Sequence, residues 1–222
     1  MNKYNLIFAL IIGSFTACEQ VGNPGDMPDW GKDATIYEVN LRQYSEDGHV
    51  SSFATHLPRL KKMGVDILWF MPLHPISMTN RKATPEIMIE EITDKEEMKK
   101  YLGSPYSVSD YRDFNPEFGT MGDFKKMLKS AHDLGMKVII DWVPNHTGWD
   151  HQWIKDHPDW YTQVDGKIIK SPTLKGEPTD WFDTAELNYD EKTLEKILLD
   201  FGVEGKIKKV SHGPVVTLNE FE

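Results

Sequence analysis

The stretch FKKMLKSAHDLGMKVIIDWVPNH, residues 124–146, carries a helix pattern, a glycine and an apolar strand pattern in direct succession. Apolar residues recur at helical spacing along its first half, at Phe124, Met127, Leu128, Ala131 and Leu134. Gly135 then provides a helix stop, and the run Val138–Ile140 predicts a short buried strand that ends at Asp141. This order predicts a helix that leads into one strand of a parallel sheet.

The same order occurs upstream, which makes the pattern a repeat. Residues 34–41 (ATIYEVNL) predict a first strand, and residues 65–71 (VDILWFM) predict a second strand that is buried on both faces. A helix between them is indicated by the spacing of four apolar residues, Phe53, Leu57, Leu60 and Met63. We expect Ser51 or Ser52 to cap this helix, although Pro58 is awkward in its first turns. Repeated βα units predict an α/β fold whose strand ends share one edge, where functional residues collect.

Two connections, residues 73–120 and 142–189, are unusually long for a compact α/β domain. The first contains DKEEMKKY, residues 94–101, which predicts an exposed helix with ion pairs of mixed sign. The second contains five of the seven tryptophans, Trp142, Trp149, Trp153, Trp160 and Trp181. Buried apolar area is the commoner use of tryptophan, so we expect most of them in a core, with a sugar platform as the alternative.

The composition excludes several classes of protein. The 222 residues carry a net charge of −10, which argues against nucleic-acid binding and against a polybasic membrane patch. The single cysteine, Cys18, excludes an intrachain disulfide and a cysteine-based zinc site.

The N-terminal residues have the order of an export signal. Lys3 precedes the apolar run Leu6–Gly13, which is too short to span a bilayer, and small residues lead to Cys18. The segment resembles a lipoprotein signal, which implies a signal peptide over 1–17, lipidation of Cys18 and a linker over 18–29. We therefore expect an exported, membrane-anchored lipoprotein, periplasmic or on the cell surface. A buried N-terminal strand or helix is the alternative.

The residues that follow the third predicted strand, DWVPNH at 141–146, offer a carboxylate, an amide oxygen and an imidazole at the strand edge. The alternative is that these residues only form the turn from the strand into the loop and have no functional role. The segment closely resembles the first conserved region of the α-amylase family, glycoside hydrolase family 13. Further segments are similar to that family in the same order, namely LWFMPLHP (68–75), GSPY (103–106), NPEFGT (115–120) and AELN (185–188). The resemblance covers roughly residues 30–190.

The resemblance implies part of a TIM (β/α)8 barrel, with about three βα units and a subdomain inserted after the third strand. Residues 30–141 would be the first part of the catalytic barrel, and residues 142–189 the inserted subdomain. Residues 190–222 would hold an incomplete barrel helix and an atypical tail.

The family resemblance also implies retaining cleavage of α-1,4-glucosidic bonds in starch, glycogen or maltooligosaccharides. Tyr106 would stack on the sugar at the cleavage site, and His146 would hydrogen-bond its primary hydroxyl. Asp141 would organise the site without being the nucleophile. Asn145 would ligate Ca²⁺ through its side-chain oxygen, with Asn188 as a weaker candidate for the same ion.

In the family, the nucleophile is the aspartate of a Gly-Phe-Arg-x-Asp motif. Neither this motif nor the family's acid/base segment occurs in the 222 residues. The faintly similar stretch FGVEGKIKK, residues 201–209, would put Lys209 in place of the nucleophile, and a lysine cannot form the glycosyl ester. We therefore expect an inactive fragment of a glycoside hydrolase that binds an α-glucan or maltooligosaccharide. A non-catalytic glycan-binding lipoprotein, or a fragment of a family transferase or branching enzyme, are the alternatives.

Overall fold

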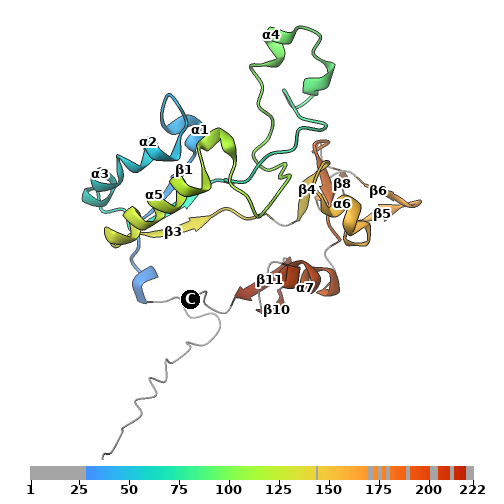
Figure 1. Ribbon diagram of the computed structural model, residues 1–222. Coiled ribbons are helices and arrows are strands. Elements are labelled where there is room, and N and C mark those ends of the chain that lie inside the picture. The colour runs from blue at the N-terminus through green and yellow to red at the C-terminus, as the bar shows by residue number, and fades with distance from the viewer. Residues whose placement is uncertain are drawn as a thin grey trace, which may run out of the picture. The chain divides into compact units, whose positions relative to one another are not determined.

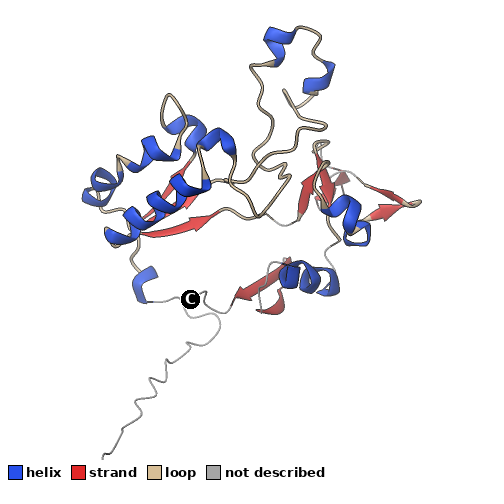
Figure 2. Ribbon diagram, in the orientation of Figure 1, coloured by secondary structure: helices blue, strands red, loops and turns tan. Residues whose placement is uncertain are grey.

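The structure is a computed structural model (Figures 1 and 2) that describes residues 29–143, 145–169, 173–174, 177–178, 181–188, 191–200, 205–210 and 213–218. The predicted signal peptide, most of the predicted linker and the lipidation site Cys18 lie outside these residues. A short 3-10 helix, η1 (Asp29–Gly31), begins the described part. Within that part, none of the helices has the length and apolar character that a membrane crossing requires.

Three parallel strands confirm the predicted α/β architecture. They are β1 (Ile36–Val39), β2 (Ile67–Phe70) and β3 (Lys137–Ile140), in the order β1-β2-β3. The register aligns Val39 with Phe70 and Phe70 with Ile140, so the three strands end at one edge. No described strand continues this sheet beyond β1 or β3, so the described residues form an open three-stranded sheet.

Helices cover one face of this sheet, as Figure 2 shows. They are α1 (Leu41–Tyr44), α2 (Val50–Ala54), α3 (Leu57–Lys62) and α5 (Met121–Asp133). Their apolar side chains meet those of the strands in one core, which includes Val39, Phe53, Leu60, Leu68, Phe70, Met127 and Ala131. The prediction of α5 is confirmed: Thr120 caps it, and Gly135 follows its end in the left-handed region with φ 71°.

The prediction of one continuous helix over Phe53–Met63 is wrong. The segment consists of α2 and α3, separated near Thr55. Pro58 has no N–H and cannot bond to the Ala54 carbonyl, which explains the break. Neither Ser51 nor Ser52 is the cap, because α2 begins after His49.

The prediction that β2 is buried on both faces is also wrong. Trp69 is 37% exposed. Its cross-strand neighbour Ile139 is 43% exposed, and Ile36 on the same face is 54% exposed. The helices cover only the other face of the sheet, so Trp69 stays exposed, although Ile67 on the same face of β2 is buried.

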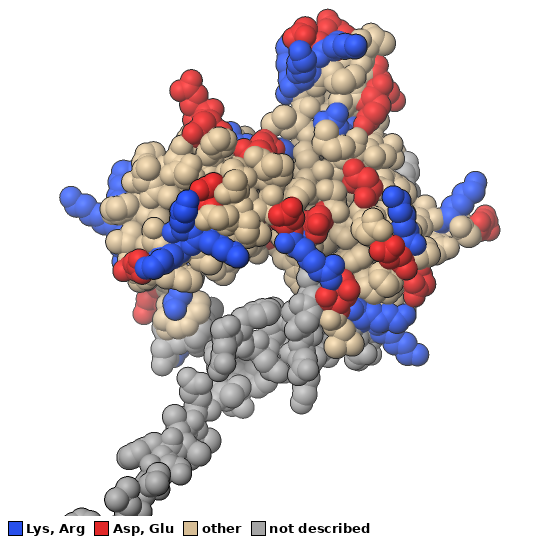
Figure 3. Space-filling model, in the orientation of Figure 1, with Lys and Arg blue, Asp and Glu red and all other residues tan. Residues whose placement is uncertain are grey.

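The connection from β2 to α5 contains η2 (Ile89–Glu91), α4 (Lys95–Met98) and η3 (Pro116–Phe118). Asp94 caps α4, and ion pairs join Glu96 to Lys99 and Glu97 to Lys100, which confirms the predicted exposed helix. On the face drawn in Figure 3, lysine and arginine side chains are interspersed with aspartate and glutamate.

The segment after β3 forms small antiparallel pairs. They are β4 (His146–Gly148) with β9 (Thr184–Glu186), β5 (Gln163–Val164) with β6 (Lys167–Ile168), and β7 (Thr173–Leu174) with β8 (Glu177–Pro178). The short helices α6 (Trp153–Asp156) and η4 (Pro158–Trp160) lie between β4 and β5. Trp153 and Trp160 enter a second buried cluster with Tyr161, Ala185 and Leu187. These two tryptophans have the core role expected for most of the five.

Helix α7 (Glu191–Asp200) follows, and its Ile197 side chain completes the second cluster. A hairpin of β10 (Gly205–Val210) and β11 (Gly213–Leu218) ends the described part. This hairpin is not among the predicted elements, because residues 205–218 lack a clear alternation of apolar and polar side chains.

Candidate functional site

Tyr106 and Asp141 meet at the edge where the parallel strands end. Asp141 follows β3 directly, and its backbone N–H donates to the Phe70 carbonyl oxygen of β2 at 2.7 Å. Tyr106 comes from the long connection after β2, and its hydroxyl donates to Asp141 Oδ2 at 3.3 Å. Two residues that are 35 positions apart therefore form one polar contact at the strand ends, where the sequence predicted functional residues.

His146 joins the same cluster from β4. Its side chain is 4% exposed, and Nε2 lies 3.1 Å from the Tyr106 carbonyl oxygen. A carbonyl only accepts, so Nε2 carries the proton and Nδ1 is left as an acceptor. Nδ1 is buried without a hydrogen-bond partner in the structure. Burial lowers the pKa of His146 to about 4, while the Tyr106 carbonyl opposes that shift, so the ring is neutral near pH 7.

The Tyr106 phenol is held in its protonated form. Burial raises its pKa, and the negative charge of Asp141 raises it further. The cluster of Tyr106, Asp141 and His146 therefore combines a hydroxyl, a carboxylate and a neutral imidazole. Such a set can exchange hydrogen bonds with the hydroxyl groups of a polar, uncharged ligand.

A hollow of about 320 Å³ lies beside Tyr106, at the ends of β1 and β2. Its lining residues are Asn40, Leu41, Arg42, Gln43, Met71, Pro72, Leu73, Pro105, Tyr106 and Phe118. The volume is at the lower end of the range of small-molecule sites.

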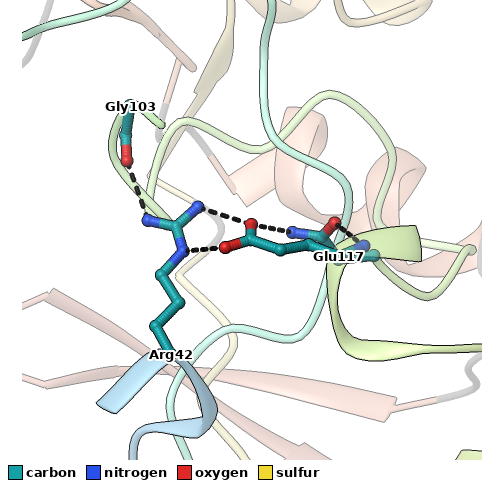
Figure 4. A network of polar contacts seen from close by, with 4 residues as sticks. Arg42, Gly103 and Glu117 are labelled. Carbon is teal, nitrogen blue, oxygen red and sulfur yellow. Dashed lines mark hydrogen bonds and ion pairs between the residues drawn. The ribbon is translucent and has the colours of Figure 1, made fainter. Parts of the chain in front are cut away.

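An ion-pair network fixes the chain that enters the Tyr106 turn (Figure 4). Arg42 donates from Nε and Nη2 to the two carboxylate oxygens of Glu117, at 2.8 and 3.0 Å. Its Nη1 donates to the Gly103 carbonyl oxygen at 2.9 Å. Gly103 has φ 94°, a conformation that favours glycine. The bidentate geometry therefore holds the turn before Tyr106 against the start of α1.

Two further contacts position the cluster, and sequence reasoning assigned no role to either. The Tyr111 hydroxyl lies 2.6 Å from the His146 carbonyl oxygen and 3.0 Å from that of Val143. Gly148 approaches Ser77 so closely that a Cβ added there would overlap Ser77 Cβ. The glycine permits its N–H to donate to the Val108 carbonyl oxygen at 2.7 Å. No local sequence signal points to the contact of Gly148 with Ser77.

The catalytic-domain model of the alpha-amylase family matches residues 25–206 of this chain. The chain belongs to the alpha-amylase family. An oligo-1,6-glucosidase of Parageobacillus thermoglucosidasius is 31% identical in an alignment of 185 positions that covers 76% of this chain and 28% of that protein. Alpha-amylase 3 of Dictyoglomus thermophilum is 27% identical in an alignment of 231 positions that covers 91% of this chain and 40% of that protein.

Solved structures of the alpha-amylase family share the fold. The crystal structure of an alpha-amylase from Lactobacillus plantarum superposes with a TM-score of 0.61 and 38% identity, over 75% of this chain and 34% of that one. A maltogenic alpha-amylase from Thermotoga neapolitana gives a TM-score of 0.59 and 31% identity. The chain thus spans less than half the length of these relatives, and its α/β portion with parallel strands is part of a TIM barrel.

A backbone hydrogen bond joins the segments that contain Asn145 and Asn188, the two residues that the alpha-amylase resemblance assigns to Ca²⁺. The Asn145 carbonyl oxygen accepts from the N–H of Leu187, the residue before Asn188, at 3.1 Å. Asn145 Oδ1 is buried without a hydrogen-bond partner, and a lone buried amide oxygen fits a hard cation. Among the described residues no cluster of three or more histidine, cysteine, aspartate or glutamate side chains is arranged for a metal.

Proposed function

We propose that this chain supplies the sugar-binding part of an α-glucan-active site of the alpha-amylase family. The observation that carries the proposal is the meeting of Tyr106, Asp141 and His146 at the strand ends. Family membership supports it, since relatives include a glucosidase, an amylase and a maltosyltransferase. The proposal is limited to recognition of α-linked glucose.

Each residue has a role in this proposal. The Tyr106 ring packs on one face of a glucosyl unit, because a pyranose presents apolar C–H groups there. Asp141 accepts hydrogen bonds from two sugar hydroxyls and also orients the Tyr106 phenol. His146 is neutral, and its Nδ1 is the acceptor that would receive a hydrogen bond from the primary hydroxyl of the sugar.

We propose further that the 222 residues alone bind an α-glucan without cleaving it. Retaining cleavage needs two carboxyl groups about 5 Å apart, one as nucleophile and one as acid and base. Asp141 is the organising carboxylate in the family resemblance, and the context of the nucleophile does not occur in these residues. Hydrolysis of a chromogenic maltooligosaccharide above the rate of a blank would contradict this part of the proposal.

Binding is tested by calorimetric titration of maltoheptaose into the purified 222-residue chain. Tyr106→Ala should weaken binding about tenfold or more, because it removes the stacking face and the partner of Asp141. Tyr101→Ala is the matched control, since Tyr101 follows α4 and its hydroxyl bonds to Glu97 of that helix. Equal dissociation constants for Tyr106→Ala and the parent chain would overturn the proposal.

We propose that Asn145 and Asn188 hold a Ca²⁺ ion, which when bound ties the loop after β3 to the segment after β9. In a thermal melt, Ca²⁺ should raise the midpoint relative to a chelator, because a ligand that binds only the folded chain stabilises it. Asn145→Ala should abolish the rise, while Asn80→Ala in the connection after β2 should retain it. A Ca²⁺ response that survives in Asn145→Ala would assign the ion elsewhere.

Export and lipid anchoring form a separate proposal, which rests on the order of residues 1–18. Radiolabelled or clickable palmitate should label the expressed parent chain and should not label Cys18→Ser. Label on Cys18→Ser, or an unlabelled parent chain, would refute the anchor.

A further inference from the structure

Tyr111 is a buried residue that joins the candidate site to the second buried cluster. Its side chain is 6% exposed, and its ring belongs to that cluster together with Trp153 and Trp160. Along the chain, however, Tyr111 precedes η3 and lies in the connection from β2 to α5, outside residues 142–189. A residue of the earlier connection is therefore built into a core that residues after β3 supply.

The Tyr111 hydroxyl holds the stretch that leads into β4. It lies 2.6 Å from the His146 carbonyl oxygen and 3.0 Å from the Val143 carbonyl oxygen. Both oxygens only accept, so the single phenol hydrogen is shared between them, and the shorter contact is the stronger bond. One hydroxyl thus holds both ends of residues 143–146, and His146 is one of these ends.

Rings packed around Tyr111 fix the direction in which its hydroxyl points. The ring centroids of His74, His151 and Trp153 lie 5.4, 5.5 and 5.7 Å from the Tyr111 centroid. A buried ring that contacts three other rings has few alternative rotamers in a close-packed core. The hydroxyl is therefore preorganised toward the His146 backbone.

The orientation of the His146 ring depends on this backbone contact. Nε2 lies 3.1 Å from the Tyr106 carbonyl oxygen, whereas the acceptor Nδ1 is buried without a hydrogen-bond partner. A hydrogen bond at one edge of a ring allows the ring to pivot about that bond. A fixed backbone is needed as the second anchor that keeps Nδ1 directed at one point.

We propose that Tyr111 is a positioning residue of the candidate site, through which the second buried cluster sets the orientation of His146 toward a bound sugar. The packing of the cluster fixes the Tyr111 hydroxyl, and the hydroxyl fixes the His146 carbonyl. Tyr111 touches no ligand and acts through His146. The inference rests on the proposed function for its ligand, whereas the state of His146 can be measured without a ligand.

The test removes the hydroxyl and keeps the ring. Tyr111→Phe should raise the maltoheptaose dissociation constant of the 222-residue chain about threefold to tenfold, the range that one lost hydrogen bond produces. The Nε2–H proton of His146, assigned by its absence in His146→Gln, should give a sharp NMR signal in the parent chain. In Tyr111→Phe this signal should broaden, because a ring that pivots exchanges its proton with water faster.

Tyr161→Phe is the matched control. Tyr161 is buried in the same cluster, and its hydroxyl lies 2.8 Å from Thr147 Oγ1, one residue beyond His146. Both variants should lower the thermal midpoint, because each loses a buried hydrogen bond of a tyrosine hydroxyl. Only Tyr111→Phe should also change the dissociation constant and the His146 signal.

The outcomes separate a positioning role from a purely structural one. A destabilised Tyr111→Phe chain with unchanged binding and an unchanged His146 signal would overturn the proposal. Equal losses of binding in Tyr111→Phe and Tyr161→Phe would also overturn it, because they would show a general loosening of the cluster. A parent chain that binds no maltoheptaose would refute the proposed function, and the His146 signal would then decide on Tyr111 alone.

Discussion

The sheet part and the inserted part of this chain bury their apolar residues in different ways. In the sheet part, helices α2, α3 and α5 cover one face, and Ile36, Trp69 and Ile139 remain exposed on the other. In the inserted part, short β pairs and α6 surround an aromatic cluster, and Trp153 and Trp160 are almost fully buried. The sheet part thus has a one-sided core, whereas the cluster of the inserted part is enclosed.

This difference shows where stability and ligand recognition arise. The exposed face of the sheet carries the charged residues Glu38 and Lys137 beside these apolar side chains, since Glu38 aligns with Trp69 and Lys137 with Ile67. The strand ends and the rim of the inserted part instead bring together Tyr106, Asp141 and His146. Substitutions in the two cores should therefore act on stability, and their effects should add, because the cores are separate clusters.

The largest effect on stability is expected from a substitution in the core on the covered face of the sheet. Phe70 is fully buried, and Phe70→Ala should lower the free energy of unfolding by about 3–5 kcal/mol through lost burial and a cavity. Ile139→Ala on the open face should change it by less than about 1 kcal/mol. Urea denaturation followed by circular dichroism measures both. Equal losses would mean that the open face is covered in solution.

Much of the sheet part could be predicted from the sequence because its signals are local. The apolar spacing from Phe124 to Leu134, with Gly135 after it, suffices for α5, and the apolar run to Ile140 suffices for β3. The exposure of Trp69 could not be predicted, because it depends on what covers the second face. Locally, VDILWFM is indistinguishable from a strand that is buried on both sides.

The candidate site was predicted in part for the same reason. The strand-end rule and the family resemblance point to Asp141 and His146, and the structure brings both to Tyr106. The support by Tyr111 and the close approach of Gly148 to Ser77 arise from contacts between distant residues. Such contacts leave no periodic pattern in the sequence, so they cannot be predicted from one sequence.

A medium effect on stability is expected at the contact between Gly148 of β4 and Ser77 of the connection after β2. Gly148→Ala should cost about 1–3 kcal/mol, because the new Cβ overlaps Ser77 Cβ and lies 3.1 Å from Ser107 Oγ, so the backbone must shift. Gly122→Ala in α5 is the matched control. Its nearest contact is 3.5 Å away, and alanine favours the helix. Thermal melts should separate the two, and a Gly148→Ala chain as stable as the parent chain would contradict the close approach.

The smallest expected effect is the pH dependence of the enclosed core. Burial lowers the pKa of His151 to about 4; Asp110, Asp150 and Asp200 oppose that shift and Arg112 reinforces it. The unfolded histidine titrates near 6.5, so between pH 6.5 and 4 the unfolded chain binds more protons and stability falls as the pH falls. At pH 5.5 the loss due to His151 should be on the order of 1 kcal/mol.

The histidine variant isolates this contribution. The backbone N–H of Trp153 donates to His151 Nδ1 at 3.1 Å. His151→Asn keeps an acceptor for this N–H and removes the titrating group. The slope of unfolding free energy against pH should become shallower in His151→Asn, and the remaining slope belongs to groups that include His146. An unchanged slope would show that His151 is not buried as described.

The central claim is that Tyr106 and Asp141 act together as one sugar-binding unit. A double-mutant cycle on maltoheptaose binding, with Tyr106→Phe, Asp141→Asn and the double variant, measures their coupling most directly. The hydroxyl-to-carboxylate contact at 3.3 Å predicts a coupling of about 0.5–2 kcal/mol, so that the double variant loses less than the sum of the single variants. Losses that simply add would contradict the claim.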